Sequence, residues 1–206
     1  FGVIVSSAPG RQEWLQPCLD SIPVETNVVE TPHFELGAIR WGLHNTDFER
    51  FLYLQDSVRI KSDAFWDLIM NSSGSVALLD SPLPYGSYLG VYERRVLERV
   101  TIPLPVTKAE AVHYEMEWVK DYLLKAPKIS VLFPVDQMVQ RFETHNGRVN
   151  LVMESPYFVK YKGTWDRSQL NPEIDGEFPR VLRRSLLSRL RLRMKLGNLS
   201  YLGVAH

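Results

Sequence analysis

The segment from Glu35 to Met70 constrains the fold of this chain more than any other stretch. A helical pattern over residues 38–43 is followed by the short apolar run Phe51-Leu52-Tyr53-Leu54, and a second helical pattern over residues 63–70 comes after Ser62, a favourable N-cap. A brief, aromatic-rich apolar run between two helices is typical of a buried strand. The segment therefore predicts helix–strand–helix, the repeating unit of an α/β sheet.

A polar triplet, Gln55-Asp56-Ser57, follows directly after this predicted strand. Open α/β sheets bind ligands at the carboxyl ends of their strands, which makes Asp56 a candidate ligand-binding residue. The alternative is that Asp56 only caps a turn. The segment alone leaves both interpretations open.

The first thirty residues predict the start of a parallel sheet. A β-branched strand pattern over residues 1–6 ends in a turn of small residues that closes at Gly10. A helical pattern over residues 11–21 and a second short strand over residues 27–30 follow, and this strand finishes on Glu30. A strand–helix–strand order of this kind predicts neighbouring parallel strands.

The composition is that of a globular protein with one core: 206 residues, of which 45% are hydrophobic and 23% charged. No apolar run approaches the roughly 20 residues that a membrane span needs, and the first residues lack the basic region of a signal peptide. The single cysteine, Cys18, excludes an internal disulfide and lies among apolar residues, so we interpret it as a small buried hydrophobe. We expect a cytoplasmic protein.

The charge is unevenly distributed. Residues 180–206 carry seven basic residues and no acid, which leaves 17 basic and 24 acidic residues, a charge of −7, on residues 1–179. Residues 179–196 have the pattern of a basic amphipathic helix. This helix could dock on the acidic body or lie, through residues 180–195, on an anionic membrane surface, which would make the protein peripheral to a membrane. Nucleic acid is the disfavoured partner, because no aromatic residues alternate with the basic ones.

Three phrases of the sequence, VIVSSAPGRQEWLQPCLDSI, GAIRWGL and FLYLQDSVRIKSDAFWDLI, resemble family-2-like inverting glycosyltransferases of the GT-A (nucleotide-diphospho-sugar transferase) fold. The resemblance covers about residues 2 to 165. It implies a Rossmann-like α/β domain over residues 1–170, with a mostly parallel sheet flanked by helices. Residues 171–206 would form the basic, amphipathic helical extension.

The resemblance also implies a reaction: transfer of a sugar from a nucleotide-diphosphate sugar, with a UDP-sugar expected, to an acceptor hydroxyl with inversion. The acceptor would be a glycan, a protein or another hydroxyl compound. The triplet matches the Asp-x-Asp motif that holds a divalent metal in the family, but only the middle carboxylate, Asp56, is present. One carboxylate with an amide and a hydroxyl is a weak site for Mg²⁺ or Mn²⁺.

By the same resemblance, the nucleotide and donor contacts fall on Ser6, Ser7, Glu30, Gly37, Arg40, Gln55, Asp56, Ser57, Gly90, Lys160 and Lys162. Glu30 matches an acid that contacts the base, and Lys160 stands where the family has a metal-side histidine. An acid lost at position 57 and a cation gained at position 160 suggest a metal-independent site, in which Lys160 or Lys162 neutralises the leaving diphosphate.

Inverting transfer also needs a carboxylate that takes the proton of the acceptor hydroxyl. A helix is predicted to begin at Pro134-Val135-Asp136 and to end at Gly147, and counting back from Gly147 matches Asp136 with the family's catalytic aspartate. Asp136 is therefore the first candidate base, although an aspartate there could simply cap the helix. Glu115 is the reserve, on the apolar stripe of a helix that opens at the capping box Thr107–Glu110.

A different function class competes with the enzyme. Val135 replaces the glutamate that precedes the family's catalytic aspartate, and Ser57 replaces a metal ligand. Both departures favour a non-catalytic module that binds a nucleotide sugar or a glycan. A nucleotidyltransferase would need a glycine-rich phosphate loop after the first strand, and residues 6–10 match that poorly.

Overall fold

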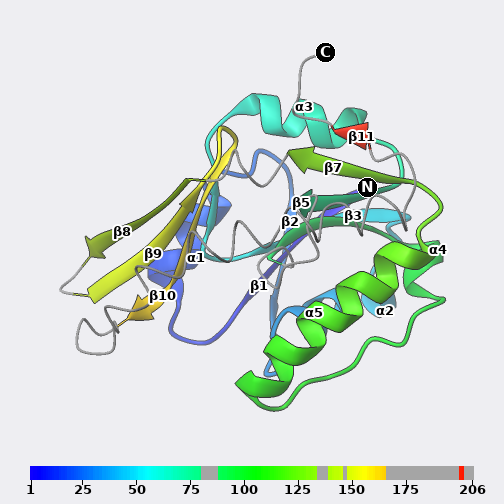
Figure 1. The fold of residues 1–206 in the computed structure, drawn as a ribbon, viewed down its shortest axis with the longest axis horizontal. Coiled ribbons are helices and arrows are strands. Elements are labelled where there is room, and N and C mark those ends of the chain that lie inside the picture. Colours follow the sequence, from blue (N-terminus) through cyan, green and yellow to red (C-terminus); the bar gives the residue numbers. More distant parts are fainter. Residues whose placement is uncertain (80–87, 134–138, 146–147, 166–199, 202–206) are drawn as a thin grey trace, which may run out of the picture.

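The chain folds into two β-sheets with helices around them (Figure 1). The computed structural model describes residues 1–79, 88–133, 139–145, 148–165 and 200–201. The larger sheet has the strand order β11-β7-β5-β6-β3-β1-β2 and the smaller one the order β4-β10-β9-β8.

The bounds of the larger sheet's strands are β1 (Gly2–Ser7), β2 (Thr26–Glu30), β3 (Arg50–Gln55), β5 (Ser75–Leu79), β6 (Leu89–Glu93), β7 (Ile129–Phe133) and β11 (Ser200–Tyr201). The smaller sheet contains β4 (Val58–Ile60), β8 (Val139–His145), β9 (Arg148–Glu154) and β10 (Phe158–Trp165). The helices are α1 (Gln12–Leu19), α2 (Phe34–Asn45), α3 (Asp63–Asn71), α4 (Arg94–Leu97) and α5 (Lys108–Lys125).

The larger sheet is mostly parallel. β1 pairs in parallel with both β2 and β3, and β7 pairs in parallel with β5 and β11. β6 is the exception, because it runs antiparallel to its neighbours β3 and β5. The prediction of an α/β fold with a mostly parallel sheet and flanking helices is confirmed.

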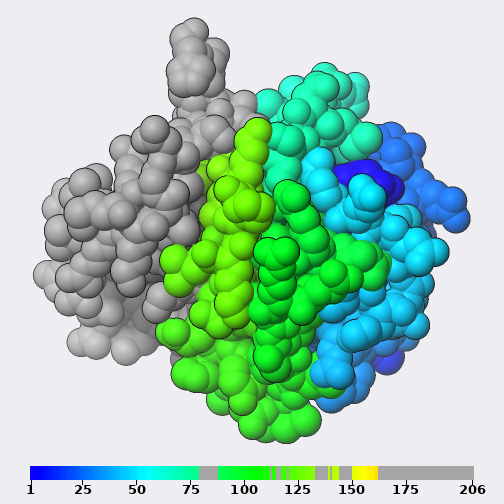
Figure 2. Space-filling model, turned by 90° about the vertical axis from the view of Figure 1, so that its right-hand side faces the viewer, coloured from blue at the N-terminus to red at the C-terminus, as the bar shows by residue number. Residues whose placement is uncertain are grey.

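Both faces of the larger sheet are covered, as the continuous apolar runs in β1 and β3 predict. On one face Val3, Val5 and Leu52 pack with α1, α3 and residues of the small sheet. On the other face Ile4 and Phe51 pack with α2, α4 and α5. Figure 2 looks onto this second face, where α5 (green) lies beside α2 (light blue).

Local capping signals in the sequence mark the starts of two helices, α3 and α5. The Ser62 side chain accepts a hydrogen bond from the amide of Ala64 at the start of α3. At the start of α5, Thr107 and Glu110 form the complete capping box. Both predictions from the sequence are confirmed.

The helix predicted from Pro134 to Gly147 is wrong over residues 139–145, which form β8. β8 pairs with β9 up to His145 opposite Arg148, and the sequence between these two residues is Asn-Gly, the strongest short signal for a tight hairpin. Val139 and Phe142, which the predicted helix would bury, are 58% and 40% exposed. Strand pairing therefore overrides the helical interpretation.

Two other predictions lie outside the described residues: the basic helix over residues 179–196 and the domain boundary after residue 170. Among the residues that the structure describes, no helix has the length and apolar character needed to cross a membrane.

A buried polar cluster at the amino end of β5 yields a stability prediction. The Tyr122 hydroxyl accepts from the Glu93 amide (2.7 Å) and is hydrogen-bonded to the Ser75 hydroxyl (2.7 Å), which donates to the Glu93 carboxylate (3.0 Å). Burial raises the pKa of Tyr122. Tyr122→Phe leaves the buried Glu93 amide without this partner, so we expect a loss of about 1 to 3 kcal/mol in the free energy of unfolding.

Denaturant unfolding measures this loss. Tyr114→Phe, at a half-buried position of the same helix, is the matched control and should change stability by much less. Equal effects of the two variants would contradict the assigned role of the cluster.

Candidate functional site

Three parallel strands end at one edge of the larger sheet. Ser7, the last residue of β1, is in register with Glu30, the last residue of β2. Ser6 is in register with Gln55, the last residue of β3. The polar residues predicted to bind a nucleotide donor after these strands therefore lie along one carboxyl edge, where open α/β sheets bind ligands.

Asp56 is buried (4% exposed) and its carboxylate is bound by two side chains. Arg11 donates from Nε to Oδ2 (2.5 Å) and from Nη2 to Oδ1 (2.7 Å), while the Ser7 hydroxyl donates to Oδ2 (2.9 Å). The two-point contact is the strong, oriented form of an arginine–carboxylate pair. It raises the pKa of the Arg11 guanidinium. Asp56 thus fixes the position of a cation, which goes beyond capping a turn.

Lys160 reaches the same triplet from the small sheet. Its residue in β10 is in register with Val58 in β4, the strand that begins directly after Ser57. Lys160 is 4% exposed, and its ammonium donates hydrogen bonds to the Gln55 side-chain oxygen and to the Ser57 hydroxyl. It also lies 5.4 Å from the centre of the Tyr88 ring, within the range of a cation–π contact.

Gln55 connects this lysine to α2. Its amide nitrogen donates to the carboxylate of Glu35, which is 8% exposed in the first turn of α2. A glutamine suits this place because one end of its amide accepts and the other donates. Two cations, Arg11 and Lys160, and two acids, Asp56 and Glu35, are therefore joined through the triplet in one polar network, which we call the edge network.

The donor set of the edge network does not fit a divalent metal. Mg²⁺ and Mn²⁺ prefer several carboxylate or carbonyl oxygens with free lone pairs. Both oxygens of Asp56 already accept hydrogen bonds from Arg11, and the oxygens of Gln55 and Ser57 face the Lys160 ammonium. A dication there would lie next to a fixed positive charge and would have to displace Arg11.

The two predicted glycines serve close packing. A Cβ at Gly37 would lie 2.5 Å from the Thr31 hydroxyl oxygen and 2.8 Å from the His33 Cβ. Gly90 is paired with both neighbouring strands, and a Cβ there would lie 3.2 Å from the Val76 carbonyl oxygen. Both contacts place protein atoms beside the glycine, at distances that explain the missing side chain.

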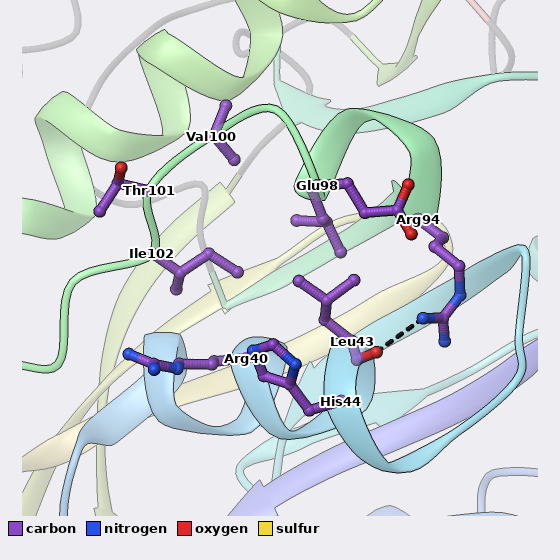
Figure 3. Close-up of a pocket in the computed structure, with 9 residues that line it drawn as sticks. Arg40, Leu43, His44, Arg94, Glu98, Val100, Thr101 and Ile102 are labelled. Atoms are coloured by element: carbon purple, nitrogen blue, oxygen red, sulfur yellow. Dashed lines mark hydrogen bonds between the residues drawn. The ribbon is translucent and has the colours of Figure 1, made fainter.

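Arg40 lies elsewhere. It is exposed on α2 and lines a surface pocket with residues of α4 and the segment that follows it (Figure 3). Glu35 and Arg40 are five residues apart in one helix and therefore point in different directions. The assignment of Arg40 to the donor site stays a prediction.

The side chains of the two candidate bases lie outside the described part of the chain. Asp136 lies outside the described residues, and β8 removes the helix on which its spacing to Gly147 was counted. Glu115 lies in α5, and the structure describes its backbone only. The same holds for Lys162, a predicted donor contact, which lies in β10 two residues after Lys160. Glu30 is described and exposed at the end of β2.

Sequence reasoning missed Arg11 and Glu35. Arg11 directly follows the turn after β1, where the carboxyl-edge rule would have selected it as readily as Ser7. Its pairing with Asp56 spans 45 positions and has no local signal. Glu35 precedes the helical pattern over residues 38–43, and no local sequence signal marks it as a residue of the site.

Cys18 lies beneath the edge network and gives a direct test of its packing. The thiol is fully buried, donates to the Gln55 carbonyl oxygen (3.7 Å), and has a pKa that burial raises from 9.0 to about 12. Each pKa unit lowers the thiolate fraction tenfold near neutral pH. We therefore expect a disulfide reagent at pH 8 to react about a thousandfold more slowly than with the unfolded chain.

Because the chain has one cysteine, the reaction can be followed by absorbance with and without urea. Rapid, complete modification of the folded protein, with an unchanged circular dichroism spectrum, would contradict this packing.

Comparisons with known proteins do not identify a family for this chain. No protein-family model matches the chain, and no curated protein matches it at a significant level.

Proposed function

We propose that this chain is a GT-A-like glycosyltransferase that moves a sugar from a nucleotide-diphosphate sugar to an acceptor hydroxyl with inversion, without a bound divalent metal. The observation that carries the proposal is the position of Lys160. A buried ammonium is held against Gln55 and Ser57 at the end of β3, where the resembled family has its metal motif. The cation would take over the metal's charge.

The order of the elements supports the fold assignment. The chain has a strand, a small-residue turn and a helix, then a strand that ends on Glu30. After α2, β3 leads into the triplet, and β4 and then α3 follow it. This is the order of elements that the sequence resemblance implies.

The electrostatics support an anionic ligand. When the sugar's anomeric carbon is attacked, its bond to the diphosphate breaks and negative charge develops on the leaving phosphate. Fixed cations stabilise such charge, most strongly where water is excluded. Lys160 is buried and oriented, and the Arg11 side chain is 40% exposed, so a phosphate at the edge of the sheet could reach it.

The remaining roles follow from position. Ser6, Ser7 and Glu30 line the same edge and would hold the nucleotide. Asp56 orients Arg11. Asp136, shortly after the carboxyl end of β7, would accept the proton of the acceptor hydroxyl as its oxygen bonds to the anomeric carbon.

A second function, binding of a nucleotide sugar without transfer, has one observation in its favour. The edge network already satisfies the Asp56 carboxylate through Arg11 and Ser7, so the network is stable without taking part in chemistry. Val135 in place of a glutamate points the same way.

Ligand binding is the first test. We expect UDP-glucose or UDP-N-acetylglucosamine, at about 100 times its dissociation constant, to raise the melting temperature by about 5 to 10 °C. The increase should be the same in excess EDTA and in Mn²⁺. Lys160→Met should abolish it, because Met fills a similar volume without the charge. Lys128→Met, which changes an exposed lysine beyond α5, should not.

A shift seen in Mn²⁺ but absent in EDTA would refute metal independence. A Lys160→Met protein that is folded and retains full binding would refute the role given to that cation.

Turnover separates the enzyme from the binding module. Asp136→Asn should lower transfer or slow hydrolysis of the UDP-sugar by about 100-fold or more while binding persists. Glu115→Gln is the paired variant, and the two together identify the base. Absence of turnover in the unmodified protein, with binding intact, would favour the module.

A further inference from the structure

The pocket that contains Arg40 is separate from the edge network and independent of the proposed function (Figure 3). It has a volume of about 470 Å³, within the range of small-molecule sites. Its walls come from α2, α4 and the segment after α4. The lining residues are Arg40, Leu43, His44, Arg94, Leu97, Glu98, Val100, Thr101 and Ile102.

The walls of the pocket are fixed by Arg94. Its guanidinium donates to the carbonyl oxygens of Leu43 (2.7 Å), Thr46 and Phe48 (3.1 Å) around the end of α2. These bonds join α4 to α2 and satisfy carbonyl groups that a helix end leaves without intrahelical partners. The pocket is therefore preformed and does not need a ligand to hold its walls apart.

The floor is apolar. Leu97, Val100 and Ile102 are 0%, 9% and 7% exposed and belong to the core beneath α2 and α5. The partly buried Leu43 packs against the same core. A hydrocarbon group placed here would be removed from water at a gain of about 25 cal/mol per Å² of apolar surface.

The rim at the α2 side is basic. Arg40 and His44 are exposed and four residues apart, so they lie on the same side of the helix. Neither side chain makes a hydrogen bond or an ion pair within the described part of the chain. Figure 3 shows Arg40 and the single acid, Glu98, at opposite ends of the pocket, which leaves the charge of Arg40 available.

We propose that this pocket binds a small organic anion, in which one carboxylate or phosphate group is joined to a short hydrocarbon part. The anionic group contacts the Arg40 guanidinium, with His44 beside it, and the hydrocarbon part packs against Leu43 and Ile102. A guanidinium suits either anion because it donates two parallel hydrogen bonds. The ligand needs both parts, since an anion alone would make no apolar contact with these walls.

Four probes test these two requirements by NMR titration of the full chain: hexanoate, hexyl phosphate, hexanol and inorganic phosphate. We expect hexanoate or hexyl phosphate to shift the amide signals of Leu43, Val100 and Ile102 in a saturable manner, and the better of the two identifies the preferred anion. Hexanol and inorganic phosphate should each bind at least about tenfold more weakly, because each lacks one half of the contact.

Three variants locate the anion. Arg40→Met should weaken the better probe about tenfold, whereas Arg99→Met, an exposed arginine outside the pocket lining, should leave binding unchanged. Glu98→Gln should bind equally or more tightly. All three positions are exposed, so the variants should fold, and circular dichroism checks this.

The proposal is overturned if neither anionic probe shifts the pocket signals. It is also overturned if Arg40→Met binds as well as the unmodified protein, or if hexanol binds as tightly as the anions, since the pocket would then be a purely apolar depression.

Discussion

The burial of one ammonium group constrains the carboxyl edge of this protein. Removing a charge from water costs several kcal/mol unless it is hydrogen-bonded and compensated. The Lys160 ammonium donates hydrogen bonds to the neutral oxygens of Gln55 and Ser57, and the Gln55 amide in turn donates to the Glu35 carboxylate, which ties β10 to the end of β3 and to α2. The register of the small sheet is thereby fixed, because a slip of one residue would turn Lys160 to the other face. The second cation, Arg11, is held differently, by a two-point ion pair with the Asp56 carboxylate. The edge network thus combines one directly paired cation with one that is held by neutral hydrogen-bond acceptors.

Two features give the triplet its chemical character. Asp56 supplies the carboxylate, but its oxygens are committed to Arg11 and Ser7. Gln55 and Ser57 present oxygen atoms to a cation that belongs to the protein. A triplet that would serve as a set of metal ligands, if it had three acids, here holds lysine and arginine side chains in place. The oxygens of the triplet are therefore already used within the protein and are not free to coordinate a hard cation.

The sequence predicts those parts of the fold that local patterns determine. The apolar runs of β1 and β3 and the caps at Ser62 and Thr107 each follow from a few neighbouring residues, and they are found where expected. The helix prediction over residues 139–145 was wrong. It followed an apolar spacing compatible with a helix, although the adjacent Asn-Gly pair is a signal for a hairpin. Arg11 was missed because its partner is distant in the chain.

Helix α2 contributes residues both to the edge network and to the pocket that contains Arg40. Its first turn carries Glu35, which bonds to Gln55, and its exposed side carries Arg40 and His44. Its last turn is clamped to α4 by Arg94. Because α2 is one continuous helix with contacts at both ends, a displacement of its first turn would also move its last turn. If an occupant of either site shifts α2, the affinity of the other site changes, and thermodynamic reciprocity makes the two effects equal in size.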